Sequence, residues 1–323
     1  MAENFAELGR VEAIRQLFEG TGYEPFGEPL WLTAGQQECI TTASGLMSEG
    51  IDFDLVYFPL PHLGRKAVLK VTGELYAVMA RPESLSVQLG VSAKLDFPQV
   101  KELWSGIVSA AKEHGYRSLS LELQPSKNGL TIALAATGRH SASVSAARPK
   151  ARSKDLICVS GPLGAAYLGL QALQREKANF DKGTRNQEAL ERYKMLVAAY
   201  LKPELEPVSL AASYGYFVTH GLADALLRLQ RDSGFGVKVY ADKIPFEGGS
   251  FDLGKELNLD PVSAAMNGGE DYHLLFVVPL AQFEQFRKDF QTFDIIGHLA
   301  QPEAGAVLVT PDGVELPLKA QGW

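Results

Sequence analysis

Strand-like and helix-like patterns both occur on each side of a short basic segment, and this mixture constrains the fold more than any other feature. Apolar residues at helical spacing predict a helix over 100–111. Alternating leucines then predict strands over 119–123 and 130–134. Beyond the small, polar, basic stretch 139–154, an apolar run over 156–159 predicts a further strand. Neither half is all-helical or all-strand, so an α/β or α+β fold is expected.

Other elements are expected from the same rules of spacing and turn chemistry. The predicted helices lie over 8–18, from about 165, over 190–200, over 222–231 and around Phe283, Phe286 and Phe290. The predicted strands lie over 31–32, 40–42, 55–58, 237–240, 274–278, 307–309 and 314–316, the last two forming a hairpin. No repeat at solenoid periods is present, so we expect globular domains.

The length and the basic segment together predict two domains. A chain of 323 residues exceeds the usual size of one domain and can bury a sizeable core. The stretch 139–154 is typical of a connection between domains. We therefore predict an amino-terminal domain over 1–139 and a carboxy-terminal domain over 140–323.

Charge and cysteine content exclude several classes of protein. With 31 basic and 38 acidic side chains, the net charge of −7 disfavours a dedicated nucleic-acid binder. The two cysteines, Cys39 and Cys158, have no metal-ligand spacing and fit a reducing compartment. The first ten residues carry acids where a signal peptide would carry bases, and no apolar run is long enough for a membrane span. We expect a cytoplasmic protein without nucleic-acid or membrane partners.

Three stretches could carry chemistry. The turn at 160–164 leads from a strand into a helix, and free amides there could bind phosphate, but we favour a plain tight turn because glycine turns are common. In 217–222, Thr219 could cap a helix and His220 could act as a base, a ligand or a structural residue. In 267–272, two glycines precede Glu270 and Asp271, and this pair could bind a hard cation. We favour a functional role for this third stretch.

The third stretch also carries a family resemblance. Its letters GGEDYHLLF resemble the Gly-Gly-Glu-Asp-Tyr-Glu-Leu motif of thiamine-monophosphate kinases, of the aminoimidazole-ribonucleotide-synthetase (AIR synthetase) superfamily. Similarity extends over essentially the whole chain, including 49–53 and 66–82. The resemblance implies a two-domain AIR-synthetase-like fold whose amino-terminal sheet domain forms a homodimer. It also implies that ATP, held by Mg²⁺, phosphorylates thiamine monophosphate to the diphosphate, a reaction that depends on positioning and charge neutralisation.

Residue roles follow from the same resemblance. Asp271 is implied as the catalytic residue, and the implied metal ligands are Glu28, Glu74, Glu122 and Asp271. Substrate contacts are implied for Gly268, Gly269, Glu270, Asp271, Tyr272, Asp52 and Trp323. Nucleotide contacts are implied for Thr41, Thr42, Thr219, His220 and Gly221.

The chain departs from the family pattern at the acids. Where the family has Gly-Asp-Asp-Ala, Ser-Thr-Asp and Leu-Ser-Asp, this chain has GEPL at 27–30, TTA at 41–43 and TGE at 72–74. Both acids of the family's Asp-Leu-Ser-Asp-Gly-Leu are replaced in FVTHGL at 217–222. Losing metal clamps on a transferred phosphoryl group costs several kcal/mol. We therefore predict a kinase-like protein of weakened or lost activity, the alternative being a non-catalytic dimeric binding or regulatory homologue. A different ATP-dependent reaction of the superfamily is a third possibility.

Overall fold

A computed structural model describes the fold of this chain. It describes Glu12, Gln16, 30–31, 38–141, Ser143, 148–183, 187–206, 212–289 and 293–320. The chain divides into two compact units, of which the amino-terminal unit is Glu28–Ala146 with Leu201–Ser209. The carboxy-terminal unit is Met1–Gly27, Ala147–Tyr200 and Leu210–Trp323. The domain limits 1–139 and 140–323 stay a prediction. Among the described helices, none is long and apolar enough to cross a membrane.

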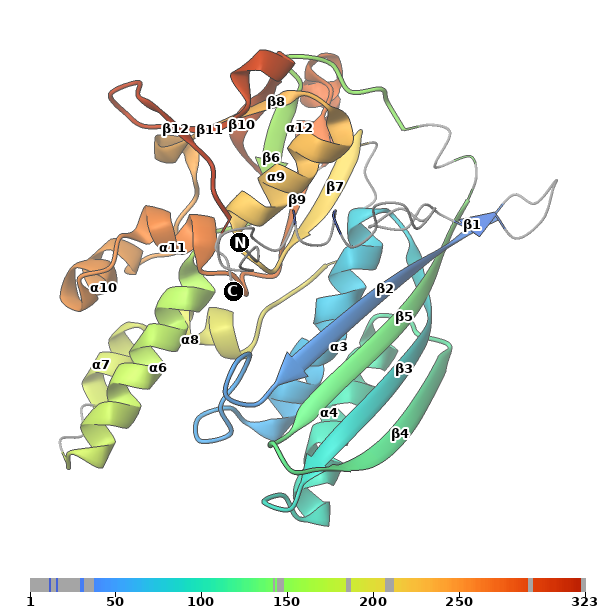
Figure 1. The fold of residues 1–323 in the computed structure, drawn as a ribbon, viewed down its shortest axis with the longest axis vertical. Helices are drawn as coiled ribbons and strands as arrows, with labels where there is room; N and C mark the ends of the chain where they lie inside the picture. The colour runs from blue at the N-terminus through green and yellow to red at the C-terminus, as the bar shows by residue number, and fades with distance from the viewer. Residues whose placement is uncertain are drawn as a thin grey trace. The chain divides into compact units, whose positions relative to one another are not determined.

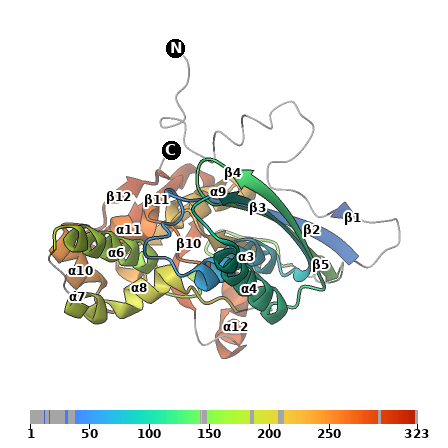
Figure 2. The ribbon, with the colours of Figure 1, turned by 90° about the horizontal axis from the view of Figure 1, so that it is seen from below.

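The amino-terminal unit is a five-stranded sheet with two long helices on one face (Figures 1 and 2). Strand order is β1-β2-β5-β3-β4, antiparallel except for the parallel β3–β4 pair. In chain order the elements are β1 (Leu30–Trp31), β2 (Glu38–Ser48), α3 (Leu60–Ala77), β3 (Arg81–Ser92), α4 (Phe97–Glu113), β4 (Ser118–Ser126) and β5 (Thr131–Ser141).

The carboxy-terminal unit contains a seven-stranded sheet of order β12-β11-β8-β10-β6-β9-β7 (Figure 1). Its strands are β6 (Leu156–Val159), β7 (Tyr214–Val218), β8 (Gly236–Tyr240), β9 (His273–Val278), β10 (Asp294–Ala300), β11 (Ala306–Val309) and β12 (Glu315–Pro317). Its helices are α6 (Ala165–Asp181), α7 (Gln187–Arg192), α8 (Lys194–Leu201), α9 (Leu222–Ser233), α10 (Ser250–Leu257), α11 (Pro261–Asn267) and α12 (Phe283–Asp289).

Two hydrophobic clusters stabilise this second unit. In the larger one, leucines of α9 such as Leu226 and Leu229 pack on buried strand residues such as Val159 and Val239. The smaller cluster joins α6, α8, α10 and α11 beside the sheet. Burial of this apolar area is the main favourable term in folding.

Most expected elements are present. The predictions of a mixed α/β chain, of the helix over 100–111 and of the strands over 119–123, 130–134 and 156–159 are confirmed. Apart from Glu12 and Gln16, the predicted helix over 8–18 lies outside the described residues, as do Leu32 and Phe290. The sequence patterns missed α3 and β3, which are 18 and 12 residues long.

Two predictions are wrong. The predicted strand over 55–58 is a turn, because Asp54 accepts hydrogen bonds from the amides of Val56, through its side chain, and of Phe58, through its carbonyl. The predicted helix over 190–200 is two helices, α7 and α8, that meet at Tyr193. The buried Tyr193 ring packs among α6 and α10 side chains, and its hydroxyl donates to Glu256. This tertiary contact overrides the helical period.

Candidate functional site

Three loops meet at one end of the carboxy-terminal sheet. Strand β9 lies antiparallel between β6 and β7, with Val159 opposite Leu275 and Val218 opposite His273. The ends of β6 and β7 and the start of β9 therefore share one edge of the sheet. The segments 160–164, 219–221 and 268–272 follow or precede these strand ends, and we call them the loop cluster. They are the three stretches that the sequence singled out.

The loops pack backbone to backbone, which explains their glycines. A Cβ atom added to Gly269 would lie 2.8 Å from the Thr219 carbonyl oxygen, and one added to Gly221 would lie 2.4 Å from the Met266 oxygen. Both glycines have positive φ, +74° and +90°. The Glu270 amide donates to the Thr219 oxygen at 2.9 Å. The cluster is thus a rigid framework that only glycine allows at these two positions.

Asp271 is the central side chain of the loop cluster. Its carboxylate is 5% exposed and accepts hydrogen bonds from the amides of Gly164, at 2.8 Å, and Ala166, at 3.3 Å. These amides belong to the first turn of α6, where the helix dipole favours a negative charge. On either side of Asp271, Glu270 and Tyr272 have positive φ of 64° and 56°. Non-glycine residues rarely adopt this conformation, and such strain often accompanies function.

His273 belongs to the loop cluster, and sequence reasoning missed it. Its Nδ1 lies 3.4 Å from the Ser160 hydroxyl, and a Cβ added to Gly161 would lie 2.4 Å from its ring. Burial lowers the pKa of His273 from the usual 6.5 to about 4. The imidazole is therefore neutral at pH 7. The signal was available in the sequence, since His273 is the mismatch with Glu in the family motif.

Other predicted site residues of this unit lie in the same cluster in different roles. The Thr219 hydroxyl is within 3.0 Å of Nδ1 of the exposed His220. The Tyr272 ring is fully buried and forms a T-shaped pair with Phe217 at a centroid distance of 5.3 Å. Gly268 lies close to Tyr167, since a Cβ atom added to Gly268 would lie 2.5 Å from the Tyr167 Cβ.

The predicted sites in the amino-terminal unit lie around β2. Thr41 and Thr42 are adjacent on β2 and therefore face opposite sides of the sheet, with Thr42 exposed. Asp52 follows the strand, accepts from the Ser48 amide at 2.7 Å and pairs with Lys70 Nζ at 3.1 Å. Both carboxylate oxygens of Asp52 thus have partners within this unit.

Known proteins resemble this chain over its length. The thiamine-monophosphate kinase of Pyrococcus horikoshii is 26% identical over 80% of this chain and 78% of its own. The solved structure described as "AaThiL complexed with AMPPCP and TMP" matches with a TM-score of 0.79, 19% identity and coverage of 100% and 99%. Escherichia coli HypE, a hydrogenase maturation protein, matches with a TM-score of 0.60, 18% identity and coverage of 96% and 97%. No family model matches.

Kinase sequences match most of this chain, and a kinase structure matches all of it. The chain is a thiamine-monophosphate kinase-like member of the AIR synthetase superfamily. The structure also confirms the mixed fold with two sheets that the resemblance implies for this kinase-like chain.

Of the acids implied as metal ligands, Glu74 and Glu122 lie on different elements of the amino-terminal unit, and their role as ligands stays a prediction. Glu74 is on α3, which covers one face of the five-stranded sheet. Glu122 is exposed on β4 and, through its register with exposed Gln88, faces the opposite side. Among the residues that the structure describes, no three His, Cys, Asp or Glu side chains form a group that could hold a metal ion. Glu28 and Trp323 lie outside that part of the chain.

Proposed function

We propose that this kinase-like chain binds a nucleotide or thiamine monophosphate and that its phosphoryl transfer to thiamine monophosphate is strongly weakened or lost. The observation that carries this proposal is the position of Asp271. Its carboxylate is buried and accepts from two backbone amides of α6. A carboxylate committed in this way stabilises the fold and has little capacity left to coordinate Mg²⁺, which requires near-octahedral oxygen ligands.

The ligand class rests on the relatives. The solved structure with a TM-score of 0.79 is described as a complex with AMPPCP and TMP. We infer that the same two ligand types, an adenine nucleotide and thiamine monophosphate, are the candidates for this chain. The loop cluster supports binding, because close backbone contacts hold its three loops in fixed positions.

The second candidate function is a non-catalytic homodimer that binds or regulates. It is favoured by the exposed face of the amino-terminal sheet, where Thr42, Ser44, Leu46 and Ala135 point away from α3 and α4. We infer that this exposed face packs against that of a second copy. The homodimer and the expected cytoplasmic location both stay predictions.

Calorimetric titration with the ATP analogue AMP-PNP, with and without Mg²⁺, followed by thiamine monophosphate, tests the proposal. We expect binding of at least one of the two ligands with little dependence on Mg²⁺. An assay of ADP release should then show turnover at least about 1,000-fold below that of the Pyrococcus horikoshii kinase, the loss expected from about 4 kcal/mol of transition-state stabilisation. Mg²⁺-dependent AMP-PNP binding with turnover near that of the relative would overturn it.

A matched variant separates catalysis from structure. If Asp271→Asn leaves ligand binding in place while abolishing a robust ADP release, Asp271 is a working catalytic group and the proposal fails. If neither ligand binds at millimolar concentration, the chain has lost the binding function as well, and the proposal also fails.

A further inference from the structure

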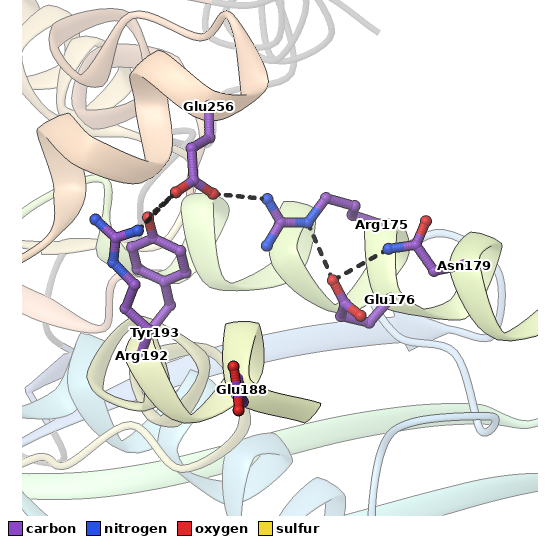
Figure 3. Close-up of a pocket in the computed structure, with 7 residues that line it drawn as sticks. All are labelled: Arg175, Glu176, Asn179, Glu188, Arg192, Tyr193 and Glu256. Atoms are coloured by element: carbon purple, nitrogen blue, oxygen red, sulfur yellow. Dashed lines mark hydrogen bonds and ion pairs between the residues drawn. The ribbon is translucent and has the colours of Figure 1, made fainter. Parts of the chain in front are cut away.

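A polar pocket lies in the carboxy-terminal unit (Figure 3). Its volume is about 400 Å³, within the range of small-ligand pockets. Residues of α6, α7 and α10 surround it together with Tyr193, and the lining is Arg175, Glu176, Asn179, Glu188, Arg192, Tyr193 and Glu256. Along α6, Arg175 is ten residues beyond the start of the helix at Ala165, which corresponds to about 15 Å. The pocket is therefore separate from the site of the proposed function.

Glu256 organises one wall of this pocket. Its carboxylate accepts from the Tyr193 hydroxyl at 2.6 Å, from Arg175 Nη1 at 3.0 Å and from Arg192 Nη1 at 3.0 Å. The Arg192 guanidinium also stacks over the Tyr193 ring, 5.1 Å from its centroid. The hydrogen bond from Tyr193 and the two arginines lower the pKa of Glu256, so it stays ionised. Four side chains from three segments are thereby held in fixed positions.

Arg175 has an unused donor in this ordered wall. Its Nε bonds to Glu176 at 3.1 Å and its Nη1 to Glu256, whereas its buried Nη2 has no hydrogen-bond partner among the described residues. In Figure 3, this nitrogen points into the space between the Tyr193 ring and Glu176. A buried guanidinium donor without an acceptor is costly, so an oxygen supplied by a ligand would be stabilising there.

The charged lining residues outside the Glu256 wall are Glu176 and Glu188, and both are negative. Glu188 lies below this space in Figure 3 and is exposed, and no ion pair of its carboxylate is found among the described residues. The three glutamates against two arginines leave the lining with a net negative charge. A simple anion would satisfy Arg175 but be repelled by this charge, and a simple cation would leave Arg175 unsatisfied. A ligand with both an anionic oxygen and a cationic amine satisfies both ends.

We propose that this pocket binds a small zwitterion of the free amino-acid class. The carboxylate of the ligand accepts from Arg175 Nη2, and its ammonium group faces Glu188. Because the wall residues are already ordered by Glu256, little conformational entropy is lost on binding.

The test uses the full-length protein and saturation-transfer NMR with each free L-amino acid at about 10 mM, a concentration that detects millimolar affinity. At least one amino acid should bind, and acetate and ethylamine, which carry only one of the two charges, should bind at least about tenfold more weakly, equivalent to one lost charged contact. No amino acid binding, or acetate binding as tight as that of any amino acid, would overturn the proposal.

Two variants locate the site. Arg175→Met removes the donor, and Glu188→Gln removes the partner of the ammonium group without touching the Glu256 network. Each should weaken amino-acid binding about tenfold, while Glu284→Gln, on the exposed surface of α12, should leave it unchanged. If Arg175→Met misfolds, amino-acid binding to Glu188→Gln alone tests whether this pocket is the binding site. Unchanged binding in Glu188→Gln would show that the amino acid binds elsewhere. AMP-PNP binding serves as a separate readout, since it should be the same in all three variants.

Discussion

At the scale of single residues, the loop 268–272 is a strained segment that positions one carboxylate. Gly269, Glu270 and Tyr272 all have positive φ, and between them Asp271 reaches the first turn of α6. For the two non-glycine residues, Glu270 and Tyr272, the energetic cost of this conformation is about 1–3 kcal/mol each and must be offset by the surroundings. Here the offsetting interactions are the two charge-assisted hydrogen bonds of Asp271 and the burial of Tyr272.

Replacing Asp271 by alanine tests this account. The change leaves two buried amides without an acceptor, so we expect the free energy of unfolding to fall by about 3 kcal/mol. The control is Asp96→Ala, which removes an exposed cap of α4 that accepts from the Gln99 amide, and should cost about 1 kcal/mol. Urea unfolding followed by circular dichroism measures both. Equal losses in the two variants would contradict a special role for the buried carboxylate.

His273 makes a second prediction at this scale. Its folded-state pKa of about 4 lies below the usual 6.5, so the unfolded chain binds a proton in this interval that the folded chain does not. Stability is therefore fully present above pH 6.5 and should fall, by up to about 1.4 kcal/mol per pH unit, as the pH drops towards 4.

Urea unfolding at pH 7.5, 6 and 5, the titration range of an unperturbed histidine, checks this prediction. The variant His273→Asn should lose stability with falling pH less steeply than the parent protein. For comparison, His298→Asn changes another histidine whose pKa is lowered, by burial and by Lys238, and should flatten the profile less. A parallel pH profile in His273→Asn and the parent would show that His273 does not contribute.

At the scale of elements, α3 and α4 cross through glycine contacts. A Cβ on Gly106 would lie 2.0 Å from the Pro61 carbonyl oxygen, and one on Gly64 would lie 2.2 Å from the Leu103 oxygen. The two helix backbones therefore touch, which brings both apolar faces down onto the five-stranded sheet. Buried residues such as Leu63, Val71 and Ile107 fill the interface. Close packing of this kind tolerates no added atoms.

Gly106→Ala should therefore separate the helices. We expect a loss of about 3 kcal/mol in the free energy of unfolding, typical of severe overpacking, or failure to fold. Ser105→Ala, at the neighbouring exposed position of α4, should change stability by less than about 0.5 kcal/mol. Thermal and urea unfolding of the two variants measure the difference. A Gly106→Ala protein as stable as the Ser105→Ala protein would exclude the glycine contact as a determinant of the crossing.

At the scale of the whole molecule, the two sheets differ in how their faces are covered. In the amino-terminal sheet, alternate residues of β2 such as Cys39 and Met47 are buried, whereas Thr42, Ser44 and Leu46 on the other face are exposed. The strands of the second sheet are largely buried, as in β9, where Leu274 to Val278 are each at most 1% exposed. An exposed sheet face that carries Leu46 among smaller residues suits association with a second copy, in keeping with the dimer that we propose.

Light scattering after size exclusion tests the dimer, with an expected mass of about twice the 35.1 kDa of the chain. Ser44 and Ala135 are opposite each other on β2 and β5, and both are exposed. Arginine at these two positions should give a folded monomer, because two like charges would be buried in the interface. Ser105→Arg on α4 should leave the mass unchanged. A parent protein of single-chain mass, or a dimer that persists in S44R/A135R, would contradict this prediction.

The sequence by itself determined the mixed fold class, most of the periodic elements and the glycine stretch 267–272. Local patterns suffice for these features, because side-chain period and turn chemistry are properties of neighbouring residues. The buried helix α3 was missed because its apolar residues lie on much of its circumference, which weakens any period.

Only the tertiary structure decided what the chemical groups do. Asp271 is a conspicuous acid in the sequence, but its partners Gly164 and Ala166 are more than 100 positions away along the chain. The pocket around Arg175 likewise joins side chains from α6 with Arg192, Tyr193 and the distant Glu256. Hydrogen bonding, desolvation and pKa depend on which groups share a volume, and chain folding, not residue order, brings these groups together.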